Sequence, residues 1–414
     1  MKTVSKLKII NDPIYGFITI PNKLVFDLME HKYFQRLRRI SQMGLSYIVY
    51  PGAHHTRFHH ALGAMFLMQK AVQVLHSKGV GISENEENAL YIAILLHDIG
   101  HGPFSHAMEN SIVENISHEQ ISLLFMEALN KKFNKQLTLA IQIFKDEYSR
   151  KFLHQLVSGQ LDMDRLDYLK RDSFYTGVPE GTVNAQRLIA MLNVKNDALV
   201  VEEKGIYSVE SFIISRRLMY WQVYLHKTGI VAEQLLVRVL KRAKQLTAQG
   251  IELPASNGLL FFLKNNISLN DFSEEVLDTF SKLDDFDIIS AMKAWVGSDD
   301  FVLKNLSKML LNRDLLKVKV KAAPFSHESV ENKRNILVEN FKISEEEASF
   351  FVFTGNLQNQ AYSMEKDTIN LLKKNGKIID VAKASDQLNL EALSKSVVKY
   401  YMCYPKNNKD SYRD

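Results

Sequence analysis

Histidine and aspartate side chains gather in four short stretches within the first 172 residues of this 414-residue chain. The stretches are RFHHALG with His59 and His60, LLHDIGHGPFSH with His97 and Asp98, SHEQ with His118, and LDMDRLDYLKRD with Asp162 and Asp164. Imidazole and carboxylate ligands from separate helices can hold a divalent first-row metal ion and leave positions open for water and phosphate oxygens. The residue types therefore predict a metal site suited to phosphoester chemistry.

The position of His97 and Asp98 strengthens this prediction. Both residues end an apolar segment, ALYIAILL, whose side chains we expect to be buried. A charged or ligating pair at that end would face the core, where its burial costs free energy unless a cation binds it. His101, His106 and Glu109 follow closely and could orient metal ligands. Ordinary capping and loop histidines are the better explanation for any one of these residues alone, but not for the whole set.

Two helical faces carry groups that suit a nucleotide. Asp164, Tyr168 and Asp172 are spaced four residues apart and so share one face. A second face combines cations and tyrosines at spacings of 4, 4 and 3 residues, namely Arg216, Tyr220, Tyr224 and Lys227. Such a stripe can hold a polyphosphate and stack on a base. Taken alone, the second face is explained more simply as a solvated helix with half-buried tyrosines.

Positive charge is spread thinly over the chain, whose formal net charge is +5. This balance permits a basic pocket for an anion but does not indicate a nucleic-acid-binding protein. Arg57, beside the His59-His60 pair, is a candidate phosphate ligand. The RLRR cluster at residues 36–39 is either a surface face or a second anion site.

The elements that must position these residues are mainly helices. Glycine (18) and proline (8) are sparse, and apolar residues recur at helical intervals from about residue 22. Ser83 and Glu86 have the spacing of a capping box. We expect further helices near 118–133, 137–145, 150–158 and 162–171, a hairpin about Lys204-Gly205, and one long helix over 208–247.

The character of the chain changes near residue 250. Residues 1–250 are predicted to form the helical domain that carries the site, and residues 251–414 a smaller C-terminal α+β lobe. Within that lobe, strand-like runs appear in LLKVKVKA, SFFVFTG, GKIIDVA and VVKYYMCY. The expected fold class is therefore mainly α, with a helical core and a C-terminal α+β lobe.

Composition and cysteine usage point to a reducing compartment. The chain is 46% hydrophobic and 24% charged, which is ordinary for a globular protein. Its single cysteine, Cys403, excludes an internal disulfide and lies in an apolar run, so we expect a packed thiol. No signal peptide and no 18-residue apolar run is visible, which predicts a cytoplasmic protein without a membrane partner.

Several segments in fixed order resemble the HD-domain deoxynucleoside triphosphohydrolases. They are NDPIYGFI, FQRLRRISQMG, YPGAHHTRFHHALG, LLHDIGHGPFSH, SHEQ, MDRLDYLKRD and RRLMYWQVYLHKTG. The likeness spans roughly residues 10–235, so the helical core is expected to be an HD domain. Members of that family cleave a dNTP into a deoxynucleoside and inorganic triphosphate.

The resemblance implies a role for each residue that matches the family pattern. The metal ligands fall on His60, His97, Asp98 and Asp164, holding one divalent ion (Mn, Fe, Zn, Co or Mg), with a second ion arriving with substrate. The catalytic positions fall on His101, His106, Glu109 and His118. The substrate contacts fall on Gln42 and Asp172 for the sugar 3′-hydroxyl, on Arg57, Arg165, Arg216 and Lys227 for the phosphates, and on Tyr168 and Tyr224 for the sugar and base.

The resemblance also implies partners beyond the dNTP substrate. Several members are activated by nucleotides bound between subunits, so it implies a nucleotide effector and a homo-oligomer, either dimer or tetramer. Asn11, Asp12 and Arg38 match the family's effector-binding strip, whereas Glu30, Tyr15 and Met43 depart from the guanine-reading pattern.

Two other hypotheses stay open at this point. The chain could be an HD phosphohydrolase that acts on another phosphoester, such as a nucleoside monophosphate or a cyclic nucleotide. It could also be a non-catalytic nucleotide-binding sensor on the same scaffold. The four matching ligand positions favour an enzyme over a sensor.

Overall fold

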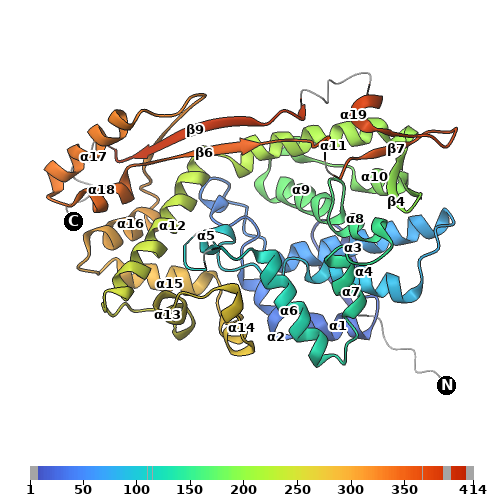
Figure 1. The fold of residues 1–414 in the computed structure, drawn as a ribbon, viewed down its shortest axis with the longest axis horizontal. Helices are drawn as coiled ribbons and strands as arrows, with labels where there is room; N and C mark the ends of the chain where they lie inside the picture. Colours follow the sequence, from blue (N-terminus) through green and yellow to red (C-terminus); the bar gives the residue numbers. More distant parts are fainter. Residues whose placement is uncertain (1–7, 110, 114, 366, 386–392, 407–414) are drawn as a thin grey trace.

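The computed structural model describes residues 8–109, 111–113, 115–365, 367–385 and 393–406, and it is mainly helical (Figure 1). A helical body carries the His/Asp stretches, and helices mixed with short strands follow it in the chain. The predicted fold class, a mainly α protein with an HD-type helical core and a C-terminal α+β lobe, is confirmed.

The chain enters through a hairpin of β1 (Ile9–Asp12) and β2 (Gly16–Thr19). The Asp12 carboxylate closes the turn because its Oδ1 accepts the amides of Ile14 and Tyr15, both at 2.9 Å. Short helical segments follow and lead to the core: α1 (Lys23–Glu30), α2 (Lys32–Gln35), η1 (Arg36–Arg39) and η2 (Ser46–Ile48).

Three helices form the centre of the body: α3 (Arg57–Ser77), α4 (Glu84–Leu96) and α9 (Met163–Thr176). Helix α3 packs against both others, so apolar residues are buried on most of its circumference. The predicted capping box of Ser83 and Glu86 begins α4, with the Ser83 amide 2.8 Å from Glu86 Oε2. Around them lie α5 (His106–Glu109), α6 (His118–Lys132), α7 (Thr138–Phe144), α8 (Lys151–Val157), η3 (Pro179–Gly181) and α10 (Ala185–Met191).

The predicted hairpin lies one strand earlier in the chain than expected. Strands β3 (Leu192–Lys195) and β4 (Ala198–Glu202) pair about Asn196 and Asp197, whose φ angles are 52° and 59°. Asn and Asp tolerate this left-handed conformation better than other non-glycine residues, which explains the turn. The expected turn residues Lys204 and Gly205 instead end η4 (Glu203–Gly205), so that part of the prediction was wrong.

The single long helix predicted over 208–247 is also wrong. The chain forms α11 (Ile206–Met219), a π-helical turn η5 (Tyr220–Tyr224), and α12 (Lys227–Ala248). The His226 side chain accepts the amide of Thr228 and so caps a new helix. Wide π turns occur preferentially at functional sites, and here the turn contains both tyrosines of the stripe, Tyr220 and Tyr224.

The C-terminal part begins with helices and ends in strands. Its elements are α13 (Asn257–Lys264), η6 (Leu269–Asp271), α14 (Glu274–Phe280), α15 (Asp285–Trp295), α16 (Phe301–Leu311), β5 (Lys317–Lys321), α17 (His327–Phe341), α18 (Glu345–Phe351), β6 (Phe353–Asn359), β7 (Asn370–Leu372), β8 (Ile378–Asp380), α19 (Val381–Ala384) and β9 (Val397–Tyr404). Two of the four predicted strands, β5 and β9, are confirmed. The other two runs are strands only in part, because α18 extends to Phe351 and α19 begins at Val381.

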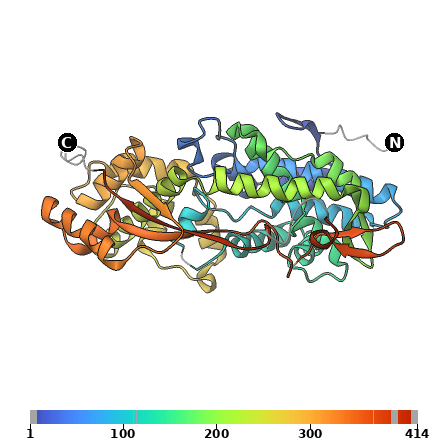
Figure 2. The same cartoon turned by 90° about the horizontal axis from the view of Figure 1, so that it is seen from above.

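Strand β6 carries the chain back toward the body, and β9, which is antiparallel to it, carries the chain away again. They run side by side along one edge of the molecule, from α17 and α18 to the region of α19 (Figures 1 and 2). Strand β7 then adds to β4 in parallel, giving a sheet of order β3-β4-β7-β8. The domain boundary near residue 250 stays a prediction, but strands from both sides of it share this sheet.

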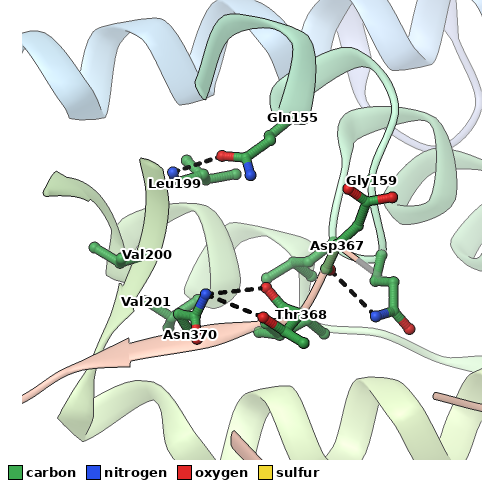
Figure 3. A pocket seen from close by; sticks show the side chains of 11 residues that line it. Gln155, Gly159, Leu199, Val200, Val201, Asp367, Thr368 and Asn370 are labelled. Carbon is green, nitrogen blue, oxygen red and sulfur yellow. Dashed lines mark hydrogen bonds between the residues drawn. The ribbon is translucent and has the colours of Figure 1, made fainter. Parts of the chain in front are cut away.

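The returning segment also contacts the loop that precedes α9. Gln160 donates to the carbonyl oxygens of Ser363, at 2.7 Å, and Asp367, at 3.2 Å. Asp367, Thr368 and Asn370 line the same pocket as Gly159 (Figure 3). A cavity of about 30 Å³, enough for a water molecule, lies between this loop, β4 and residues 367–370. Residues beyond 360 therefore pack against the loop that leads into α9, the helix that carries Asp164.

Two predictions drawn from composition can be compared with the structure. Cys403 is fully buried on β9, and burial raises the pKa of its thiol to about 12, so it is a packed thiol as expected. Within the described part of the chain, no helix combines the length and apolar character needed to cross a bilayer.

Candidate metal centre and adjoining cavity

The structure brings the four predicted metal ligands to one point. His60 lies on α3, His97 and Asp98 follow the end of α4, and Asp164 lies in the first turn of α9. Asp164 Oδ1 is 3.0 Å from His60 Nε2 and 3.4 Å from His97 Nε2, and the two Nε2 atoms are 3.3 Å apart. Asp98 adds oxygens 3.5 Å from His97 Nε2 and 3.8 Å from His60 Nε2.

The outer nitrogen of each imidazole is already satisfied. His60 Nδ1 is 2.8 Å from Asp167 Oδ2, and His97 Nδ1 is 2.7 Å from the Ile94 carbonyl oxygen. Both acceptors require a proton on Nδ1, so each neutral ring directs an Nε2 lone pair at the other. Two facing lone pairs at this distance repel one another unless a proton or a metal ion lies between them. The donor set therefore fits a divalent metal ion.

The pKa values of His60 and Asp164 also favour a cation at this point. Burial alone would lower the pKa of His60, but hydrogen bonds to Asp164 and Asp167 outweigh it and raise the pKa to about 10. Burial opposes ionisation of Asp164 as well, yet the contacts with His60 and His97 hold the pKa of its carboxyl below the usual range. The cluster thus favours a positive charge at its centre, which a metal ion would supply in place of the proton.

A second group of predicted residues adjoins the first through Asp98. His101 Nδ1 is 3.4 Å from Asp98 Oδ1, and the rings of His101 and His118 are stacked with centroids 3.8 Å apart. Glu109 Oε1 is 3.0 Å from His118 Nδ1. His106 is the first residue of α5, and its side chain lies outside the described part of the structure.

Arg57 links the metal cluster to a cavity. Its guanidinium pairs with Asp98 through Nη1 and donates from Nη2 to the Ser105 hydroxyl at 2.7 Å. Its buried Nε has no partner among the described residues. The adjoining cavity has a volume of about 380 Å³, within the size range of small-molecule sites.

Five of the predicted substrate-binding residues line this cavity, namely Gln42, Arg57, Tyr168, Asp172 and Tyr224. Leu45, Phe104 and Leu236 add apolar surface. The buried Oε1 of Gln42 lacks a hydrogen-bond partner within the described structure. An unsatisfied acceptor on a cavity wall is available to a ligand hydroxyl.

Asp172 is held by two ring side chains. Tyr224 donates its hydroxyl to Asp172 Oδ2 at 2.7 Å, and His55 Nε2 is 2.7 Å from Asp172 Oδ1. His55 is fully buried and stacked on Tyr175 with centroids 4.4 Å apart. The sequence reasoning did not assign His55 a role, although it lies in the AHHTRF segment beside Arg57.

The other three predicted phosphate ligands, Arg165, Arg216 and Lys227, differ in their exposure and in their contacts. Arg165 Nη1 donates to the Gly159 carbonyl at 2.8 Å, and the Arg216 guanidinium lies 5.8 Å from the Tyr220 ring centroid. Each has a buried Nε without a partner among the described residues. Lys227, by contrast, is exposed at the start of α12 and does not line the cavity. The break after η5 separates it from the stripe.

Sequence reasoning missed a buried network behind His60. Asp167 is fully buried and receives Arg171 Nε at 2.9 Å and Nη2 at 3.0 Å. Arg171 also donates from Nη1 to Asp12 Oδ2 at 2.8 Å, which connects His60 to the N-terminal hairpin. The available signal was spacing, because Asp167 follows Asp164 by one helical turn.

Comparison with known proteins agrees with this geometry. Two family models match the chain, the HD domain over residues 57–172 and the HD associated region over residues 183–255. The protein YwfO of Bacillus subtilis is 31% identical over 98% of this chain and 93% of its own length. The deoxynucleoside triphosphate triphosphohydrolase SAMHD1 homolog of Dictyostelium discoideum is 31% identical over 58% of this chain and 50% of its own length.

A solved structure is similar over nearly the whole chain. A phosphohydrolase from Bacteroides thetaiotaomicron is 52% identical, covers 97% of this chain and 100% of its own, and superposes with a TM-score of 0.94. Fold and site together are those of a metal-dependent phosphohydrolase of the HD type. The chain belongs to the HD-domain family that includes the deoxynucleoside triphosphate triphosphohydrolases.

Proposed function

We propose that this protein hydrolyses dNTPs to a deoxynucleoside and inorganic triphosphate. One observation supports the proposal most strongly. Beside the His/Asp cluster, three arginines, Arg57, Arg165 and Arg216, each have a buried Nε without a partner among the described residues. Guanidinium donors suit the oxygens of a polyphosphate better than those of a single phosphate group. The SAMHD1 homolog of Dictyostelium discoideum, whose name states this activity, is consistent with it.

His60, His97 and Asp164 would hold the metal ion, with Asp98 as the fourth ligand, since its oxygens lie 3.5 Å from His97 Nε2 and 3.8 Å from His60 Nε2. Such an ion, when bound, supplies Lewis acidity and lowers the pKa of water at the α-phosphorus. Arg57, Arg165 and Arg216 then bind the phosphate oxygens and offset negative charge that grows during the reaction. The contacts with Asp98 and Ser105 use two of the five N–H donors of Arg57, so its Nε and the second hydrogens of its Nη atoms could bind a phosphate oxygen while both contacts persist.

His118 is the candidate proton donor to the leaving 5′-oxygen. Its Nδ1 is 3.0 Å from Glu109 Oε1, and this carboxylate orients the ring and stabilises an imidazolium formed on it. His106 is the alternative donor from the sequence analysis. The stacked ring of His101 restricts the orientation of His118 from one side.

The sugar would lie between Asp172 and two tyrosine rings. Tyr168 and Tyr224 have centroids 6.1 Å apart and both line the cavity. Asp172 and Gln42 offer acceptors for the 3′-hydroxyl, while the rings crowd the 2′ side and exclude a ribose hydroxyl. The nucleotide effector and the homo-oligomer stay predictions from the resemblance.

The test is a panel of the four dNTPs with Mn²⁺, Fe²⁺, Co²⁺, Zn²⁺ and Mg²⁺, reading nucleoside and phosphate products together. We expect deoxynucleoside and tripolyphosphate in equal amounts. Asp98→Asn should lose both bound metal and turnover while keeping its helical signal, whereas Asp299→Asn, at an exposed position, should behave as the wild type. Orthophosphate as sole phosphate product would indicate another phosphoester as substrate. Tight dNTP binding without turnover would indicate a sensor.

A further inference from the structure

The buried carboxylate of Asp285, at the start of α15, reaches the main chain of the HD domain at two places. Its Oδ2 accepts the amide of Ser41 and its Oδ1 accepts the amide of Phe104, both at 2.8 Å. Asp285 belongs to residues 251–414, whose function the sequence left open, and only 7% of its surface is exposed. Both amides belong to segments that form the candidate site.

The Ser41 amide lies next to Gln42, which lines the cavity. This segment is also held from its other side, since the Gln42 amide donates to the His55 carbonyl at 3.0 Å. A hydrogen bond from Ser41 to Asp285 therefore fixes the backbone from which the Gln42 side chain projects. A shift here would move an acceptor of the sugar subsite.

The Phe104 amide lies in the loop that joins His101 to the short helix α5. Phe104 and Ser105 have φ angles of 50° and 56°, in the left-handed region that non-glycine residues adopt only at a cost in free energy. Such a conformation persists when surrounding contacts impose it. Asp285 binds the first of these two residues, and Arg57 binds the hydroxyl of the second.

A second contact holds the other end of the same loop. The fully buried Arg36 donates to the carbonyl oxygens of Ile99, at 2.9 Å, and His101, at 2.6 Å. Its guanidinium lies 5.2 Å from the ring centroid of Phe280, the last residue of α14, and 5.5 Å from that of Phe125. The backbone between Asp98 and Ser105 is thus fixed at both ends by groups that residues beyond 250 provide or support.

The two contacts come from one short stretch of the C-terminal part. Phe280 ends α14, Asp284 pairs with Arg39 and caps α15, and Asp285 is the first residue of α15. A buried carboxylate has a high desolvation cost unless it receives strong hydrogen bonds. If the residue at this position only stabilised the packing of α15, an apolar side chain would be sufficient. The carboxylate of Asp285 therefore indicates a role in binding the amides of Ser41 and Phe104.

We propose that Asp285 is a positioning residue, through which the C-terminal lobe holds the catalytic loop 99–105 and Gln42 in register with the metal centre. The lobe is then part of the active site's framework, and its removal would leave the metal ligands present but the loop unfixed. The inference goes beyond the proposed substrate, since it holds for any phosphoester cleaved at this centre.

The experiment compares Asp285→Asn with Asp300→Asn in the full-length protein. Asparagine has nearly the same shape as aspartate but offers one acceptor, so one of the two backbone amides loses its partner. Asp300 pairs with Arg242 at 2.5 Å and caps α16 far from the loop, and asparagine can keep that cap. Asp300→Asn therefore controls for a general loss of stability in the C-terminal lobe.

We expect Asp285→Asn to lower kcat by about 10- to 100-fold at unchanged metal content, because small misplacements of catalytic groups have effects of this size. Amide hydrogen exchange in peptides covering residues 97–108 should accelerate in this variant and stay at the wild-type rate in Asp300→Asn. The exchange measurement needs no substrate, so it separates failure of this inference from failure of the proposed dNTPase activity.

Equal kcat per folded molecule in both variants, or equal exchange in the loop, would overturn the proposal. If Asp285→Asn does not fold, Phe280→Leu offers the second test, because it keeps an apolar side chain but removes the one of the two rings contacted by Arg36 that the C-terminal part provides. Faster exchange over residues 97–108 in that variant supports the proposal, and wild-type exchange contradicts it.

Discussion

His60 Nδ1 and Asp167 Oδ2 lie 2.8 Å apart at the centre of the molecule, where both side chains are fully buried. The hydrogen bond directs His60 Nε2 toward His97 and Asp164. A carboxylate in this place fixes the tautomer of a metal-binding histidine and raises its basicity. Arg171 compensates the charge of Asp167 with two hydrogen bonds of its own.

Asp167→Asn should weaken metal binding about 10- to 100-fold, as is usual when the partner of a ligating histidine is removed. An amide can accept from His60 or from Arg171 but cannot serve both as the carboxylate does. The measurement is metal affinity by competition with a chelator on the purified, folded variant, and turnover should recover at high metal concentration.

The control for this prediction is Glu86→Gln. Glu86 is buried and pairs with Arg150 at 2.9 Å, at the start of α4 and away from the metal ligands. This variant also disrupts a buried ion pair, so it should lose stability without losing metal affinity. Equal metal affinities in the two variants would show that Asp167 has a structural role alone.

Gly63→Ala should reduce both stability and metal affinity, although Gly→Ala within a helix usually stabilises by about 0.5–1 kcal/mol. A Cβ at Gly63 would lie 2.0 Å from Asp167 Oδ1 and 2.2 Å from Arg171 Nη2. Both side chains are buried and fixed by each other, so they must move away from His60. Thermal unfolding and the chelator competition measure the two effects. Gly229→Ala, within α12, where nothing lies within 4 Å of the added Cβ, is the matched control, and a Gly63→Ala protein as stable as that control would contradict the prediction.

The convergence of the metal cluster could be predicted because its signals are local. His97 and Asp98 end an apolar helix, and Asp164 lies at the start of another, so residue type and position indicated the stretches that converge, whereas the choice of His60 over His59 and of Asp164 over Asp162 rested on the family resemblance. Asp285 carries no such signal. It lies 244 residues from Ser41, and only the fold brings the two together.

Two errors of the sequence prediction have different physical origins. The spacing of Arg216, Tyr220, Tyr224 and Lys227 fits one regular helix, and nothing in this spacing signals the π turn at Tyr220–Tyr224 or the new helix that begins at Lys227. Periodicity therefore predicted one continuous stripe, and the exposed Lys227 shows that the stripe ends at the break. The hairpin was misplaced because Lys204-Gly205 resembles a turn as much as Asn196-Asp197 does.

Acid should destabilise the protein partly through His31. This residue caps α2 by accepting the Tyr33 amide, and its Nε2 lies 2.8 Å from Lys132 Nζ. Burial, followed by the charges of Lys132 and Lys32, lowers the pKa of His31 from 6.5 to about 4. The unfolded chain therefore binds a proton before the folded one does, so the stabilisation is complete above pH 6.5 and is lost as the pH falls toward 4.

His31→Asn should make the free energy of unfolding less dependent on pH between 6.5 and 4, because asparagine can cap the helix but does not titrate there. Urea unfolding at a series of pH values measures this slope. Asparagine at His76, an exposed position on α3, provides the control and should leave the slope unchanged. Identical slopes for the wild type and His31→Asn would mean that other groups cause the acid sensitivity.

Substitutions of Tyr224 can distinguish two ways in which the proposed sugar subsite could exclude ribonucleotides, through the ring of Tyr224 or through its hydroxyl. Its ring crowds the cavity beside Tyr168, and its hydroxyl donates to Asp172 at 2.7 Å. If the ring excludes the 2′-hydroxyl, Tyr224→Ala should reduce the preference for dNTPs over NTPs by about 10-fold or more, since pockets reject an added hydroxyl by roughly 100-fold at most through shape. Tyr224→Phe should keep that preference while raising KM, because Asp172 loses one hydrogen bond but the ring remains. The ratio of kcat/KM for a dNTP and its NTP decides between them, and an unchanged ratio in Tyr224→Ala would show that the sugar binds elsewhere.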